Sequence, residues 1–115
     1  MTRSPDSPPL KPAVFHILLA LADQDRHGYA IMQAVREQSA GQVPLRTGSF
    51  YRHLSRLIDD GFVVETPARP SDDDPRRGAY YRLTPLGVRV LARERDRLSA
   101  LVASLGALRP RRGPA

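Results

Sequence analysis

The sequence predicts a mainly α-helical domain that carries one small β-hairpin. Four segments place apolar residues at helical spacing, and two short segments, at residues 62–65 and 80–83, alternate apolar with polar side chains. A chain of 115 residues is long enough for one domain with a modest core. The expected order of elements is helix, helix, helix, strand, strand, helix.

The first two helices are predicted from apolar periodicity. The first is expected to run from Pro12, which suits the first helical position, to Ala22. Almost all of its residues are apolar, so we expect burial on two sides, one against the domain and one against a second subunit. Phe15 and Leu19 form part of the stripe assigned to that subunit contact. The second helix is expected over about residues 28–39.

The third helix has two faces of different chemistry. Pro44 forbids a helix before it, so residues 43–45 are predicted as a short edge strand added to the hairpin. Thr47 is expected to cap the helix through its side-chain oxygen, and Gly61 to end it. The face expected in the core carries Phe50, Leu54, Leu57 and Ile58. The opposite face carries Ser49, Arg52, His53 and Arg56.

The C-terminal half is predicted as a long hairpin followed by a fourth helix. The loop between the strands at residues 62–65 and 80–83 is rich in proline, aspartate and glycine. Thr84 is expected to cap a helix over residues 85–108. Leucines recur on it at heptad spacing, interrupted at Glu94, which favours a dimerisation seam. The leucines assigned to that seam are Leu91, Leu98, Leu101 and Leu105.

These elements describe a winged helix-turn-helix domain over residues 10–84 with a C-terminal dimerisation helix over residues 85–108. Residues 1–9 are expected to be a disordered tail, and residues 109–115 a basic flexible tail. No secretory signal is visible, and the longest apolar run is far shorter than the roughly 20 residues that cross a bilayer. A soluble cytoplasmic protein that does not bind membranes is therefore expected.

The net charge of +6 does not by itself locate a nucleic-acid surface. Residues 85–115 carry seven basic and two acidic groups, whereas residues 47–84 carry six of each. The surplus therefore lies outside the third helix. A DNA-binding role must be argued from where the charges are placed.

Three stretches of the sequence resemble the PadR family of transcriptional regulators. They read "HGYAIMQAVRE" at residues 27–37, "TGSFYRHLSRLIDDGFV" at residues 47–63 and "RRGAYYRLTPLG" at residues 76–87. With the first helix, the resemblance covers about residues 10–108. It implies a homodimeric repressor with the winged helix-turn-helix fold, of a kind that often responds to small aromatic or drug-like effectors. Some members stack the ligand on a tryptophan, which this chain lacks.

The polar face of the third helix is predicted to enter the major groove of double-stranded DNA, where arginine can pair with base-edge acceptors. The wing arginines are expected at phosphates or in the minor groove. Tyr51 is equally open to a core role, and His53 to a plain surface role. A two-fold dimer implies a pseudo-palindromic operator. The residues predicted to contact DNA are Thr47, Ser49, Tyr51, Arg52, Arg56, Arg76 and Arg77.

Two other classes of function compete with a DNA-binding regulator. A winged-helix module could act through protein contacts alone, with its arginines only solvating the surface. An enzyme is disfavoured, because the three histidines show no triad spacing and no phosphate-binding glycine loop is present. The run "SDDDP" lacks the spacing of a cation loop, and the chain has no cysteine. No catalytic residue, metal site or cofactor is predicted.

Overall fold

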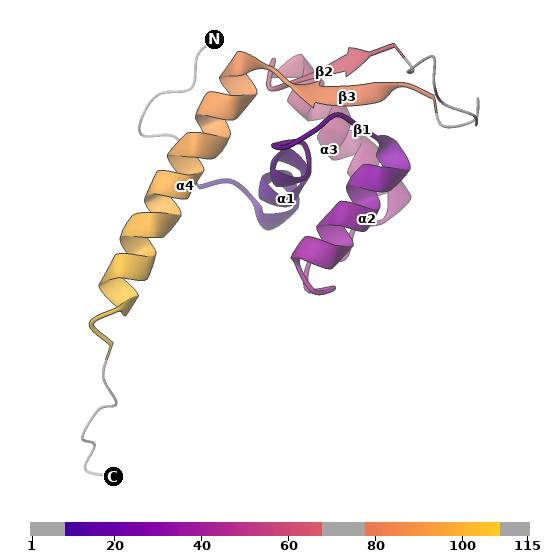
Figure 1. The fold of residues 1–115 in the computed structure, drawn as a ribbon. Coiled ribbons are helices and arrows are strands. Elements are labelled where there is room, and N and C mark those ends of the chain that lie inside the picture. Colours follow the sequence, from indigo (N-terminus) through magenta and orange to yellow (C-terminus); the bar gives the residue numbers. More distant parts are fainter. Residues whose placement is uncertain (1–8, 68–77, 109–115) are drawn as a thin grey trace.

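The computed structural model describes residues 9–67 and 78–108, which form four helices and a three-stranded antiparallel sheet (Figure 1). The elements are α1 (Pro12–Ala20), β1 (Arg26–His27), α2 (Gly28–Gln38), α3 (Thr47–Asp59), β2 (Val63–Thr66), β3 (Tyr80–Leu83) and α4 (Pro85–Leu105). The predicted fold class, mainly helical with a small hairpin and a C-terminal helix, is confirmed. Among these elements, no helix is both long and apolar enough to cross a bilayer.

The sheet has the strand order β1-β3-β2, so β3 is the central strand. Val63 of β2 lies opposite Leu83 of β3, and the pairing continues to the base of the wing loop. On the other edge, Arg26 of β1 lies opposite Tyr81. The edge strand expected at residues 43–45 was therefore wrong, because β1 takes that place in the sheet.

Residues 43–45 instead follow the end of α2 and pack on the core. The backbone N–H of Val43 donates to the side-chain oxygen of Ser39 at 3.2 Å, which satisfies the donor locally rather than in a ladder. The side chains of Val43 and Leu45 pack against the buried cluster. These contacts fix the path of the chain from α2 into α3.

The hydrophobic core lies where α1, α2 and α3 meet the sheet. Helix α3 contributes Phe50, Leu54 and Leu57, each no more than 2% exposed. Because these residues repeat at helical spacing, their burial fixes the rotation of α3 about its own axis. The other large, fully buried side chains are Ile17, Leu18, Ile31, Val35 and Val63.

Several predicted boundaries are confirmed and others shift. Gly61 follows α3 with a φ of +81°, and Thr84 caps α4 by accepting the N–H of Gly87 at 3.0 Å. Phe62 precedes β2 rather than opening it. Helix α1 ends two residues earlier than predicted, at Ala20, and α4 three residues earlier, at Leu105.

The predicted side-chain cap at Thr47 was wrong. Thr47 is the first residue of α3, and Arg46 before it has the extended backbone of an N-cap, with φ −78° and ψ 153°. A side-chain cap requires a short polar residue at that extended position. Arginine supplies none, so α3 begins without a side-chain cap hydrogen bond.

Glu94 faces its own domain rather than a dimer seam. The residue is 6% exposed, and its carboxylate accepts two hydrogen bonds from Arg97, at 2.7 and 3.0 Å, and one from the N–H of Leu10 at 3.3 Å. The hydrogen bond from Arg97 lowers the pKa of the Glu94 carboxyl from its ordinary value. Its contribution to stability is therefore present at neutral pH and is lost as the pH falls through that lowered pKa.

Gly87 sets how closely the first turn of α4 approaches β2. A Cβ at this position would overlap the carbonyl oxygen of Phe62 and lie 3.3 Å from the Leu83 side chain. We expect Gly87→Ala to lower the free energy of unfolding by about 1–3 kcal/mol. Chemical unfolding at a fixed protein concentration measures this.

Gly48 in α3 is the matched control, because nothing lies within 4 Å of a Cβ built there. Gly48→Ala should raise the free energy of unfolding by about 0.5–1 kcal/mol through helix propensity alone. Equal effects of the two substitutions would contradict the packing of α4 described here.

Candidate nucleic-acid interface

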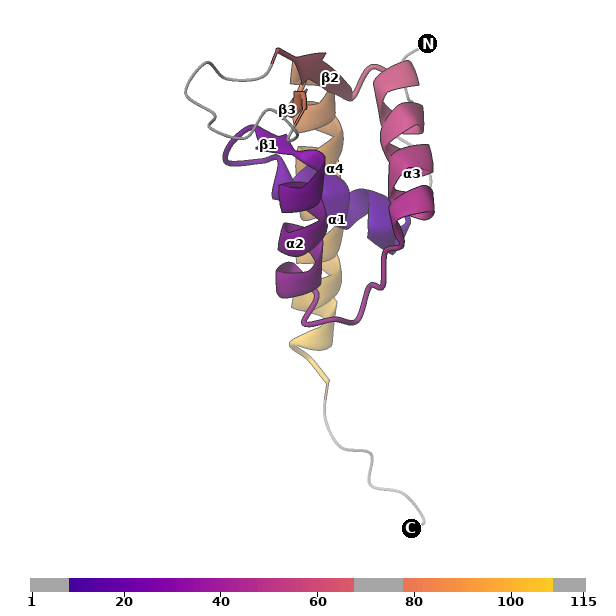
Figure 2. The ribbon, with the colours of Figure 1, turned by 90° about the vertical axis from the view of Figure 1, so that its right-hand side faces the viewer.

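The outer face of α3 presents two arginines. Arg52 and Arg56 lie one helical turn apart and are both exposed, opposite the buried stripe of the same helix. Within residues 9–67 and 78–108 neither guanidinium forms an ion pair, and Arg52 Nη2 donates to Ser49 Oγ at 3.3 Å. Helix α3 lies at the edge of the molecule, to the right of α1 and α4 in Figure 2. Both cations are therefore accessible to an anionic partner.

The start of α3 adds backbone donors to this face. Arg46, Thr47 and Gly48 are all exposed, and the first turn contains no acidic residue. The unpaired N–H groups and the positive end of the helix dipole suit a phosphate group. Sequence reasoning missed Arg46, although a basic residue directly before a predicted helix start was the available signal.

Tyr51 combines packing with exposure. Its ring is 48% exposed and meets the Phe50 ring edge-to-face, with centroids 4.9 Å apart. Its hydroxyl lies against the start of α2, 2.7 Å from where a Cβ on Gly28 would be. Burial, followed by the Glu65 carboxylate and Tyr51, raises the pKa of Tyr81 on the neighbouring strand. Tyr51 is therefore a contact between α3, α2 and the sheet that still shows one edge to solvent.

The predicted α3 residues share one surface. Thr47, Ser49, Tyr51, Arg52 and Arg56 all come from its first three turns. A shallow hollow on this surface is lined by Gly48, Tyr51, Arg52, Ser55, Arg56 and Asp59. The predicted wing contacts Arg76 and Arg77 lie outside the described residues.

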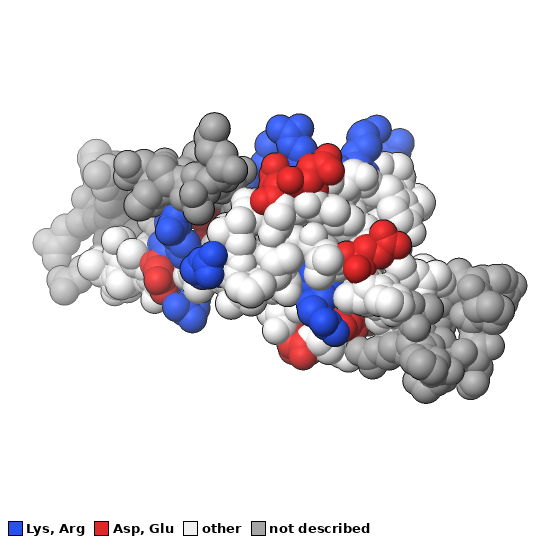
Figure 3. Space-filling view, turned by 90° about the horizontal axis from the view of Figure 1, so that it is seen from above, with Lys and Arg blue, Asp and Glu red and all other residues white. Residues whose placement is uncertain are grey.

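Charge of both signs covers the described surface around this face. Asp59 and Asp60, in and just after the last turn of α3, are exposed. Seen from above, basic and acidic side chains lie beside one another over the top of the domain (Figure 3). The interface is therefore defined by individual arginines rather than by a uniformly basic surface.

The histidines of the described residues have structural contacts. His27 caps α2 by accepting the N–H of Ala30 at 3.3 Å, and its ring meets the Tyr80 ring edge-to-face. His16 lies 3.3 Å from the side-chain oxygen of Gln38. The part of the chain that the structure describes contains no cluster of histidine or acidic residues able to hold a metal ion.

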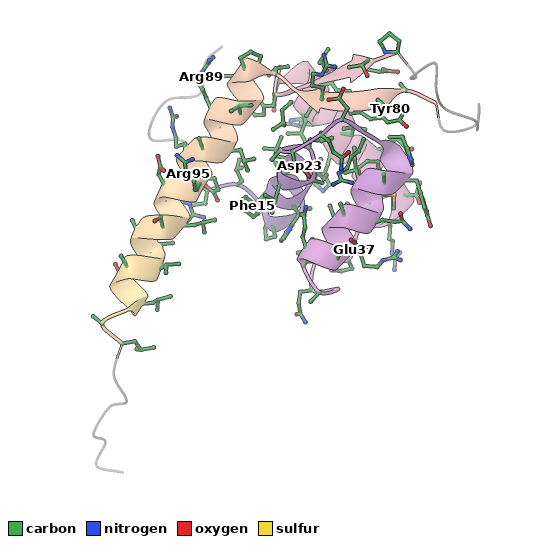
Figure 4. All side chains as sticks on the ribbon, in the orientation of Figure 1. Phe15, Asp23, Glu37, Tyr80, Arg89 and Arg95 are labelled. Carbon is green, nitrogen blue, oxygen red and sulfur yellow. The ribbon has the colours of Figure 1, made fainter. Side chains whose placement is uncertain are left out.

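A second surface lies between α1 and α4. An apolar groove of about 510 Å³ is bordered by Phe15 and Leu19 of α1 and by Leu91 and Leu98 of α4. Figure 4 labels Phe15 and Arg95, which stand on its two walls. Further along α4 the apolar side chains leave the domain: Leu101 is 49%, Leu105 62% and Val102 66% exposed. The structure thus groups four of the six predicted dimerisation residues around one groove.

Comparison with known proteins follows from this geometry. The family model described as the transcriptional regulator PadR-like family matches residues 17–93. No curated protein gives a significant match. Several solved structures are similar, and at their levels of identity the likeness shows the fold.

Three of the similar structures come from bacterial regulators. A PadR family transcription regulator of Clostridium difficile has 21% identity and a TM-score of 0.70, over 84% of this chain and 96% of that chain. A transcriptional regulator of Clostridium thermocellum has 19% identity and a TM-score of 0.66, over 85% and 90%. PadR of Bacillus subtilis, solved in complex with operator DNA, has 18% identity and a TM-score of 0.63, over 89% and 62%.

The contact between Gly28 and Tyr51 yields a double-mutant prediction. Gly28→Ala should lower the free energy of unfolding by about 1–2 kcal/mol, because the new Cβ displaces the Tyr51 hydroxyl. The same change in a Tyr51→Phe background should cost less, since its closest ring atoms would be 3.4 Å away. Denaturant titration of the four proteins measures the coupling. Strict additivity would contradict the contact.

Proposed function

Because the chain belongs to the PadR-like family of transcriptional regulators, we propose that it binds double-stranded DNA sequence-specifically through the outer face of α3. The observation that carries this proposal is the exposed pair Arg52 and Arg56 on the side of α3 opposite its buried stripe. A guanidinium in the major groove can donate two hydrogen bonds to one guanine. Ser49 supports this role by holding the Arg52 side chain along the helix.

The positioning contacts go to phosphates. Arg46 and Thr47 at the open start of α3 offer a guanidinium, a hydroxyl and backbone N–H groups to one phosphate. The exposed edge of Tyr51 offers a further hydroxyl. Arg76 and Arg77 of the wing loop act at the backbone or the minor groove, where negative potential favours arginine.

The regulator acts as a homodimer that forms through α1 and α4. Large apolar side chains exposed along one helix are costly in water and are buried at a rate of roughly 25 cal/mol per Å² when a partner covers them. Two-fold symmetry then sets two α3 helices about one DNA turn apart, which calls for a pseudo-palindromic operator. The residues of this interface are Phe15, Leu19, Leu91, Leu98, Leu101 and Leu105.

Occupation of the operator by this dimer represses transcription in the cytoplasm. The apolar groove of about 510 Å³ between α1 and α4 falls in the size range of small-molecule sites. An aromatic or drug-like effector in that groove would change how α4 helices pack and so alter the spacing of the two α3 helices. Release from the operator follows from that change.

Arg52→Ala tests the base-reading role. We expect an affinity loss of about 5- to 150-fold for promoter DNA and a smaller loss for a random duplex, because a base contact is removed. Asp59→Ala should leave affinity unchanged or raise it slightly, since it removes an exposed carboxylate from the same helix. Fluorescence anisotropy at several salt concentrations measures both variants. Equal affinity of the unsubstituted protein for promoter and random DNA at every salt concentration would favour the protein-interaction module instead.

The double substitution Leu101→Asp and Leu105→Asp tests the dimer. Both side chains are at least 49% exposed in the single chain, so the fold should survive while the interface is lost. Analytical ultracentrifugation should show a monomer. Val64→Asp, at a side chain 43% exposed on β2, should keep the dimer. A doubly substituted protein that still sediments as a dimer would disprove this interface.

A further inference from the structure

A groove of about 470 Å³ separates α3 from the chain segment that precedes α1. Arg52 and Arg56 lie on one side, and Lys11, the N-cap residue of α1, on the other. Lys11 is exposed, and its ammonium has no hydrogen bond or ion pair to any residue that the structure describes. The floor between them is mostly apolar, with Leu10, Val14, Leu57 and Phe62.

The two flanks of α3 differ in charge. On the Lys11 flank, three basic residues and one acidic residue, Asp60, border the groove. On the other flank the hollow shares the same two arginines but adds no further cation, and it ends at Asp59. A helix in the major groove has a sugar-phosphate strand on each side. The Lys11 flank is the one better suited to hold such a strand.

The segment that carries Lys11 is fixed in place by α4. The N–H of Leu10 donates to the buried Glu94 carboxylate at 3.3 Å, and the Leu10 side chain packs against the core. Glu94 is itself held by Arg97, through hydrogen bonds of 2.7 and 3.0 Å. One buried carboxylate therefore joins the N-terminal segment to the helix that also carries the exposed leucines.

We propose that Lys11 contacts a backbone phosphate of the bound DNA and that Glu94 is a positioning residue that holds Lys11 beside α3. The proposal rests on the proposed function, because it extends the same DNA surface across the groove. It also gives α4 a direct connection to that surface: a displacement of α4 moves Glu94, Leu10 and Lys11 together. The interface would then depend on α4 for phosphate contact as well as for dimerisation.

Lys11→Ala in the full chain tests the phosphate contact. One lost phosphate contact makes the slope of log K against log salt less negative by about 0.9, and it weakens binding to promoter and random duplexes by the same factor, about three- to tenfold. The ratio of the two affinities should stay unchanged, in contrast to Arg52→Ala. Arg89→Ala is the matched control, because Arg89 is an exposed arginine near the start of α4 (Figure 4). That variant should keep the original slope.

Glu94→Ala tests the positioning role. It should reduce the salt slope as Lys11→Ala does, and the double variant should be no weaker in DNA binding than either single variant. Glu94→Gln keeps an acceptor oxygen for the Leu10 N–H and should restore most of the slope. A lower melting temperature with an unchanged slope would mean that Glu94 is only structural and would overturn this role.

The failure of this inference is distinguishable from failure of the proposed function. If the unsubstituted protein prefers its promoter over random DNA and Lys11→Ala leaves the slope unchanged, the phosphate contact is disproved and the proposed function stands. If the unsubstituted protein shows no preference at any salt concentration, the proposed function fails, whatever the Lys11 variant does.

Discussion

The burial of Phe50, Leu54 and Leu57 is the constraint on which the rest of the molecule depends. Each of these side chains is almost completely removed from solvent, and together they leave α3 a single rotational setting against α1 and the sheet. Since residues 52 and 56 lie on the opposite side of a helix with 3.6 residues per turn, Arg52 and Arg56 must face outward. The core therefore decides which side chains can meet DNA, and the same packing that stabilises the domain also orients the proposed reading surface.

Periodicity and backbone chemistry explain which parts of the fold were predictable from the sequence. The apolar stripe of α3, the positive φ of Gly61 and the Thr84 cap of α4 all arise from residues close in sequence. The two-residue strand β1 has no such local signal, because Arg26 and His27 pair with β3 only after the chain has folded. Residues 43–45 looked extended because of Pro44, but the Ser39 side chain takes the Val43 donor that a strand would have used.

The candidate site shows the same division. Arg52 and Arg56 could be found from spacing alone, whereas Arg46 and Lys11 flank helix starts and become part of the surface through tertiary packing. Glu94 interrupted a heptad pattern, and its i,i+3 relation to Arg97 was the only sequence signal for the pair that the structure shows. Which backbone group this carboxylate would hold, that of Leu10, 84 residues away, could not be read from spacing. A buried ionic group thus links two surfaces that appear unrelated in the sequence.

The most direct measurement of whether α3 reads DNA is selection of bound duplexes from a random library by the purified full-length chain. The expected result is an enriched pseudo-palindromic motif whose half-sites are centred about one helical turn, roughly 10 base pairs, apart, with guanines at the positions that α3 faces. Recovery of duplexes without a shared motif, despite binding to the library, would contradict the central claim that outward-facing arginines of α3 recognise sequence.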